Sequence, residues 1–101
     1  MTREMYERAL ERMRELGDVR EKISSDSGRM VRTAAVFARR PIAEGVEMAK
    51  AWMDLAAEVG GLVSLFVYRS SEFDGATVEW LITREVSADE VAAQEVERCA
   101  G

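Results

Sequence analysis

One proline and a pair of glycines bracket the most apolar helical pattern in this chain. Pro41 is the only proline, and Gly60-Gly61 follows it further along the sequence. Proline fits the first turn of a helix, and glycine commonly ends one. Residues 42–59 carry apolar side chains over more than half of the helical circumference, with only a narrow charged stripe. We therefore expect a helix over residues 42–59 that lies in the middle of the fold.

The hydrophobic period changes after the glycines. Residues 62–70 and 76–86 alternate in polarity and are rich in Val, Ile, Phe, Tyr and Trp, which is typical of β-strands. Asp74-Gly75 is a strong signal for a two-residue hairpin turn. A turn at that place pairs Val67 with Ile82 and predicts an antiparallel hairpin with one mainly apolar face. Three further apolar residues then share the less buried face: Phe66, Tyr68 and Leu81.

Apolar residues at helical spacing predict further helices on both sides of this region. One covers about residues 2–24 and a second about residues 27–40, with a serine-rich break between them. A Ser-x-x-Glu capping box that begins at Ser87 predicts a last helix over about residues 87–99. The order of elements is then α-α-α-β-β-α, in a single α+β domain over residues 1–101. Its helices pack on a two-stranded antiparallel hairpin, which either ends within the chain or extends across a homodimer.

The composition is typical of a folded domain and excludes much catalytic chemistry. Of 101 residues, 48% are apolar and 33% are charged, with 14 Lys and Arg against 19 Asp and Glu. The chain has no histidine, which removes the commonest general base and metal ligand. Its single cysteine, Cys99, excludes an internal disulfide and a multi-thiolate zinc site. We therefore expect no enzyme, with no catalytic, cofactor-binding or metal-binding residues, and we expect Cys99 to be an inert buried thiol.

The sequence also indicates a compartment. The N-terminus is charged from its third residue, so it lacks the apolar core of a signal peptide. The longest stretch without a charge, residues 59–68, is too short to span a membrane. A single thiol fits a reducing environment. We expect a cytoplasmic protein without a membrane partner.

Charge is unevenly distributed along this acidic chain. The net charge of −5 is the sum of +4 in residues 27–43, which contain no acid, and −9 in the remainder. On the predicted second helix, four basic residues form one stripe: Arg29, Arg32, Arg39 and Arg40. Such a stripe can bind phosphates or an acidic protein partner through charge-assisted contacts. The alternative is a solvated face paired with glutamates of neighbouring helices.

Two apolar features offer further candidate surfaces. Phe66, Tyr68 and Leu81 form either a docking surface, or a sheet continued in a homodimer, or a face covered by a helix of the same chain. The predicted helix over residues 42–59 also carries a strip of small residues around one tryptophan: Gly45, Ala49, Trp52 and Ala56. This strip favours a close helix–helix contact over a ligand cleft.

These features favour a binding protein. Inhibitors, immunity or antitoxin-like proteins and antagonists encoded by phages or mobile elements are often of this size and charge. We therefore expect a small acidic cytosolic protein that blocks a protein partner by steric occlusion. One alternative is a nucleic-acid or nucleotide binder that uses the basic stripe. Another is a structural or assembly subunit that self-associates through the hairpin.

Overall fold

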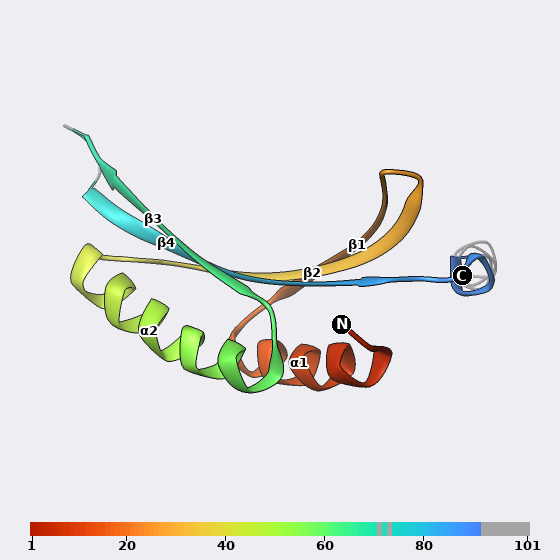
Figure 1. Ribbon diagram of the computed structural model, residues 1–101. Helices are drawn as coiled ribbons and strands as arrows, with labels where there is room; N and C mark the ends of the chain where they lie inside the picture. The colour runs from red at the N-terminus through yellow and green to blue at the C-terminus, as the bar shows by residue number, and fades with distance from the viewer. Residues whose placement is uncertain (71, 73, 92–101) are drawn as a thin grey trace.

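The computed structural model describes residues 1–70, 72 and 74–91 (Figure 1). A further helix begins at Ala88, and Val91 is its last described residue, so Cys99 and most of the predicted last helix lie outside the described residues. The complete elements, in chain order, are α1 (Arg3–Leu16), β1 (Val19–Asp26), β2 (Arg29–Arg40), α2 (Ile42–Val59), β3 (Leu62–Arg69) and β4 (Asp74–Glu85).

The four strands form one antiparallel sheet in the order β1-β2-β4-β3. Figure 1 shows α1 and α2 beneath one face of this sheet, while neither helix covers the other face, which we call the open face. The prediction of an α+β fold is therefore confirmed. The predicted order α-α-α-β-β-α and the two-stranded hairpin are wrong, because two segments predicted as helices contain strands.

The first of these corrections concerns residues 2–24. α1 begins after Thr2, whose Oγ1 accepts a hydrogen bond from the Met5 amide at 3.2 Å, and it ends at Leu16. Ile23 is in helical phase with Met5, but it belongs to β1 and pairs with Arg32 of β2. A backbone hydrogen-bond ladder to the next strand thus replaces the helix that local spacing predicts.

The second correction concerns residues 27–40, which form β2 instead of a helix. Ser27 and Gly28 have φ values of 52° and 80° and join β1 to β2, as the two central residues of a tight hairpin turn do. β2 then pairs with β1 on one side and β4 on the other. Because both of its edges are satisfied, this central strand is stable although its apolar residues also fit a helical period.

The β3–β4 hairpin forms with a different register from the predicted one. Val67 pairs with Ala76 instead of Ile82, a shift of six residues, and Asp74-Gly75 lies in β4 instead of forming the turn. An ion pair of 3.4 Å between Arg69 Nε and Asp74 Oδ1 closes the hairpin at this end. Because the shift is an even number of residues, every side chain keeps the face that the sequence predicts for it.

The core lies between the helices and the sheet. Its largest fully buried side chains come from α1 and from the two central strands, β2 and β4: Trp80, Tyr6, Met13, Ile82, Val36 and Val78. α2 lies close to the sheet at Gly45, where an added Cβ would stand 2.7 Å from the Ala76 Cβ. The strip of small residues on this helix therefore includes a close helix–sheet contact, where a helix–helix contact was expected.

Candidate interaction surface

The four arginines predicted to form one stripe do not form a common surface. Arg29 and Arg40 lie at opposite ends of β2, about 36 Å apart at the usual rise of about 3.3 Å per residue. Arg32 pairs with Arg84 on the face covered by the helices, while Arg39 points to the open face. Arg29 forms a 3.1 Å ion pair with Glu85, with both side chains exposed. The basic stripe therefore does not exist as a single site.

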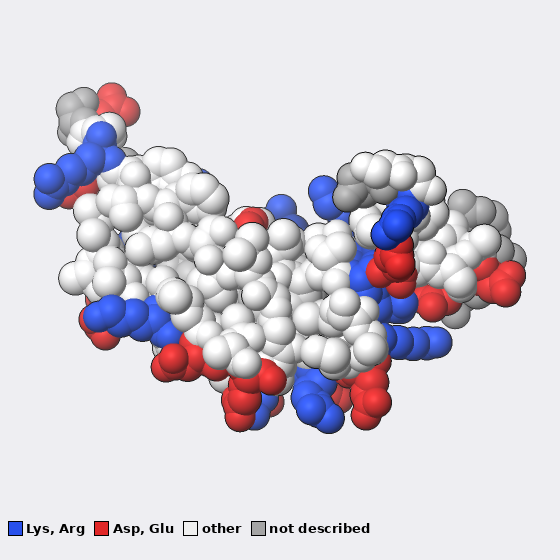
Figure 2. Space-filling model, in the orientation of Figure 1, with Lys and Arg blue, Asp and Glu red and all other residues white. Residues whose placement is uncertain are grey.

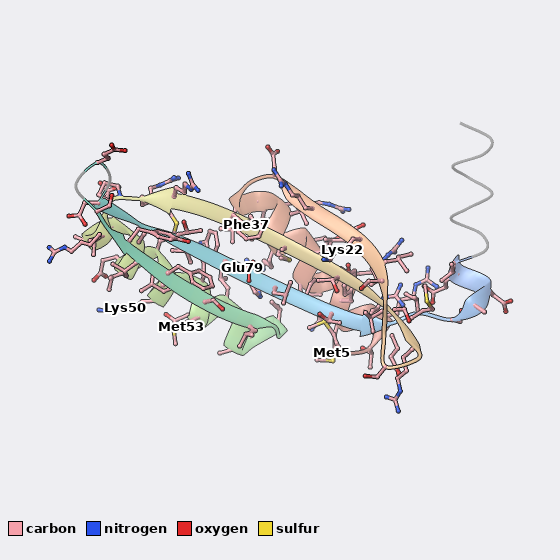
Figure 3. All side chains as sticks on the ribbon, turned by 90° about the horizontal axis from the view of Figure 1, so that it is seen from above. Met5, Lys22, Phe37, Lys50, Met53 and Glu79 are labelled. Carbon is pink, nitrogen blue, oxygen red and sulfur yellow. The ribbon has the colours of Figure 1, made fainter. Side chains whose placement is uncertain are left out.

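The three apolar hairpin residues, in contrast, meet on the open face. Phe66 and Tyr68 of β3 are 49% and 47% exposed, and Leu81 of β4 is half-buried between its neighbours. Two residues that the sequence analysis did not single out join them: Phe37 of β2 and Leu62 of β3, which are 48% and 63% exposed. We call this set of five residues the open-face patch. Strand pairing brings these residues together: Leu62 of β3 lies opposite Leu81 of β4, and Phe37 of β2 lies opposite Glu79 of β4 (Figure 3).

The patch lies in a hollow of the molecular surface. Figure 1 shows the β1–β2 and β3–β4 hairpins bending away from the helices at opposite ends of the sheet. Figure 2 shows the same side as a mostly uncharged depression between two raised ends. A concave apolar area of this kind is unusual on a monomeric protein and typically marks an interaction site.

Basic residues border the open-face patch along one side. Arg20 and Lys22 of β1 and Arg39 of β2 point to the open face, since they alternate with residues that face the helices. Glu79 of β4 points to the same face, and Figure 3 shows it close to Phe37. Close to the patch, the open face therefore combines apolar side chains with three basic residues and two acidic ones, Glu79 and Asp18.

Aromatic and basic side chains also line a shallow cavity of about 510 Å³ on this face. Its lining residues come from the segment before β1 and from all four strands: Asp18, Arg20, Phe37, Arg39, Tyr68 and Thr77. Arg39 and Tyr68 also line an adjoining cavity of about 350 Å³. The two guanidinium groups and two aromatic rings are thus available to one ligand.

A second polar cluster lies at the opposite end of the sheet, on the face covered by α1. Arg84 is only 4% exposed, and its guanidinium carbon lies 5.2 Å from the centre of the Tyr6 ring. Its Nη1 and Nη2 donate to the two carboxylate oxygens of Glu90 at 3.3 and 2.8 Å. This ion pair connects the start of the last helix to the core of the sheet.

The same contacts change the titration of these groups. The hydrogen bonds from Arg84 lower the pKa of Glu90, and the bond to Glu90 raises the pKa of Arg84. Burial raises the pKa of Tyr6 to about 12, with the Glu21 carboxylate acting in the same direction. The adjoining cavity of about 700 Å³ is lined by Arg3, Arg29, Arg84 and Glu90 among others, so its basic groups already face carboxylates of the same chain.

The described residues hold no group of three or more Asp, Glu, Cys or His side chains that could bind a metal ion. None of the helices in this part of the chain is long and apolar enough to cross a membrane.

Comparison with protein families, with curated proteins and with solved structures finds no match for the chain.

Sequence reasoning missed part of the open-face patch because it treated β2 as a helix. The sequence prediction placed Phe37 in the helix over residues 27–40, and Arg20 and Lys22 in the helix before it. A signal for a strand was present, since Val31, Thr33 and Val36 are β-branched and Phe37 is aromatic. This signal was outweighed by the helical spacing of the same residues.

Proposed function

We propose that this protein catalyses no reaction and acts by binding another protein through the open-face patch. It works as an inhibitor or antagonist that covers the working surface of its partner. The observation that supports this proposal is the concave apolar area itself, which holds three half-exposed aromatic rings and exposed Leu62. Aromatic side chains are enriched among the residues that dominate binding energy in protein interfaces.

The charges around the patch indicate the chemistry of the partner. Arg20, Lys22 and Arg39 border the patch, so a complementary surface combines apolar side chains with carboxylates. Charges at the rim of an interface act mainly on the association rate and on specificity, while the apolar centre supplies most of the affinity. The absence of histidine from the chain agrees with a function that needs no general base.

The test compares partner capture by variants of two equally exposed residues. Phe37→Asp places a carboxylate in the open-face patch, while Met5→Asp places one on α1, where Met5 is 46% exposed. Immobilised proteins are incubated with nuclease-treated extract of the native cell, and the retained proteins are quantified. Proteins retained by wild type and by Met5→Asp should be reduced at least tenfold with Phe37→Asp, about 1.4 kcal/mol. Equal retention by all three proteins would contradict the proposal.

A nucleic-acid binder is the second candidate, favoured by the cavity that joins Phe37, Tyr68, Arg20 and Arg39. Aromatic rings between arginines can stack on the bases of a single strand. A fluorescent single-stranded oligonucleotide then binds with an affinity that falls steeply with added salt. Binding that survives high salt, or capture that survives nuclease treatment, favours the protein partner instead.

A further inference from the structure

Exposed apolar side chains are concentrated along one edge of the molecule. Of the ten large hydrophobic residues exposed in the described part of the chain, five belong to β3: Leu62, Leu65, Phe66, Val67 and Tyr68. They point to both faces of the sheet, since Leu65 and Val67 alternate with the residues of the open face. Met53 of α2, 58% exposed, lies beyond the outer edge of β3 in Figure 3.

β3 is also an edge strand whose outer side pairs with no strand among the described residues. Residues 62–68 include no charge and no proline. Natural sheets usually protect such an edge with charged residues, proline or a bulge, because an unprotected apolar edge pairs with another strand. The opposite edge shows this protection, because β1 carries Arg20, Glu21 and Lys22 in succession. The two edges of the same sheet therefore differ in what they can bind.

We infer that β3 pairs antiparallel with β3 of a second copy of this chain, around a two-fold axis perpendicular to the sheet. This inference goes beyond the proposed function and does not depend on it. The strand is its own complement, because every residue of 62–68 then meets an uncharged residue of the second copy. A strand of an unrelated protein could form the same backbone hydrogen bonds, but this edge carries no charged residue that would recognise a particular strand.

Alternation of the side chains limits the register of this pairing. Residues opposite each other in an antiparallel pair point to the same face, so an open-face residue must meet another open-face residue. Leu65 on the axis satisfies this condition, and it pairs Val63 with Val67 and Leu62 with Tyr68. Phe66 on the axis also satisfies it but places Arg69 opposite Val63. We therefore assign the register centred on Leu65, because it alone pairs all seven residues 62–68 with one another and leaves Arg69 outside the apolar ladder.

The resulting dimer contains one continuous sheet of eight strands. A two-fold axis perpendicular to the sheet keeps both pairs of helices on one face and both open faces on the other. The two open-face patches then adjoin across the new strand pair, because Leu62, Phe66 and Tyr68 belong both to the patch and to the edge. A partner thus meets a surface twice as wide as that of one chain.

The first experiment measures mass in solution with multi-angle light scattering or sedimentation over a range of concentrations. The wild-type chain of 11.3 kDa should show a mass twice as large. Val67→Lys places a charge on the paired edge at a 53% exposed position and should give a monomer. Phe37→Asp, two strands from the edge, should remain dimeric. Circular dichroism and thermal unfolding establish that each variant is folded.

The second experiment tests the register by disulfide crosslinking in a Cys99→Ala background. Leu65→Cys places the two thiols opposite each other across the axis, at a separation within the range that a disulfide spans. It should crosslink nearly completely under mild oxidation. Leu62→Cys is more exposed, at 63% against 39%, but it lies opposite Tyr68 and should crosslink much more slowly.

Three results would overturn the inference. A wild-type mass that stays monomeric at every concentration excludes the dimer. A dimer that persists with Val67→Lys but dissociates with Phe37→Asp shows pairing through the open face instead. Crosslinking of Leu62→Cys as fast as that of Leu65→Cys excludes the assigned register. Loss of partner capture by Phe37→Asp with the dimer intact separates this inference from the proposed function.

Discussion

Two adjacent glycines determine how the chain passes from α2 to β3. Gly60 and Gly61 have φ values of 100° and 112°, which side chains other than glycine rarely adopt. The Gly60 carbonyl accepts a hydrogen bond of 3.0 Å from Trp80 Nε1, the indole at the centre of the core. A Cβ on Gly61 would overlap the same nitrogen. Gly61 is therefore required both by its backbone conformation and by the close approach to Trp80.

We predict that Gly61→Ala destabilises the fold more than Gly28→Ala does. Both glycines have positive φ, but a Cβ on Gly28 would meet no atom within 4 Å. Gly28→Ala should cost about 1–2 kcal/mol of backbone strain, and Gly61→Ala about 2 kcal/mol more, because the core must shift. Urea unfolding of the two variants measures the difference. Equal losses of stability would show that strain alone acts at Gly61.

The ion pair between Arg84 and Glu90 makes stability depend on pH. The hydrogen bonds from Arg84 hold the pKa of Glu90 below its ordinary value of 4.5 in the folded protein. The carboxylate therefore stabilises the fold above that ordinary value, and its contribution is lost as the pH falls through the lowered pKa. Glu90→Gln should be less stable than wild type at neutral pH, and the difference should shrink in acid. A difference in unfolding free energy that stays constant with pH would contradict this assignment.

At the scale of the elements, α2 is the segment that the sequence predicts best. The bounds of the structural helix, Ile42–Val59, agree with those expected from Pro41 and Gly60-Gly61. Local chemistry determines both ends. Proline fixes a φ that suits the start of a helix, and glycine readily adopts the positive φ with which a helix ends. The strip of small residues on the helix was also recognised, although its partner was not.

We predict that this contact tolerates no larger side chain at its centre. Gly45→Val should destabilise the fold by about 1–3 kcal/mol, because overpacking separates α2 from Ala76 on β4. Ala51→Val is the matched control, since Ala51 is exposed on the same helix and its replacement should cost about 0.7 kcal/mol or less. Denaturant unfolding measures both. Because valine is a better helix former than glycine, a loss at position 45 no larger than that at position 51 would contradict the helix–sheet contact.

β2 shows why the other elements were harder to predict. In an extended strand its apolar residues divide between two faces, with Ala34 and Val36 against the helices and Phe37 on the open face. The same residues also fit a helical stripe, so their spacing does not distinguish the two structures. The distinction comes from β1 and β4, which supply hydrogen bonds on the two sides of β2, β1 through the adjoining hairpin and β4 from far along the chain.

At the scale of the whole molecule, the helical layer and the open face of the sheet carry different charged residues. The charged stripe of α2 lies on the helical layer and carries four acids, Glu44, Glu47, Asp54 and Glu58. Lys50 forms a 3.3 Å ion pair with Glu47 there. Arg20, Lys22 and Arg39 face the other way. Net charge therefore does not describe what a partner meets on the open face. The proposed dimer would place both open faces on one side and direct a single large surface toward the partner.

The sequence by itself determined α2 and its ends, the presence of β3 and β4, the face on which each hairpin residue lies, and the absence of histidine chemistry. These properties depend on neighbouring residues or on composition. The tertiary structure alone decided that β1 and β2 are strands, that the β3–β4 register is shifted, and that Phe37 joins Phe66 and Tyr68 on one surface. The physical reason is that strand pairing satisfies the backbone through residues of other strands, and local periodicity does not encode which strands pair or in which register.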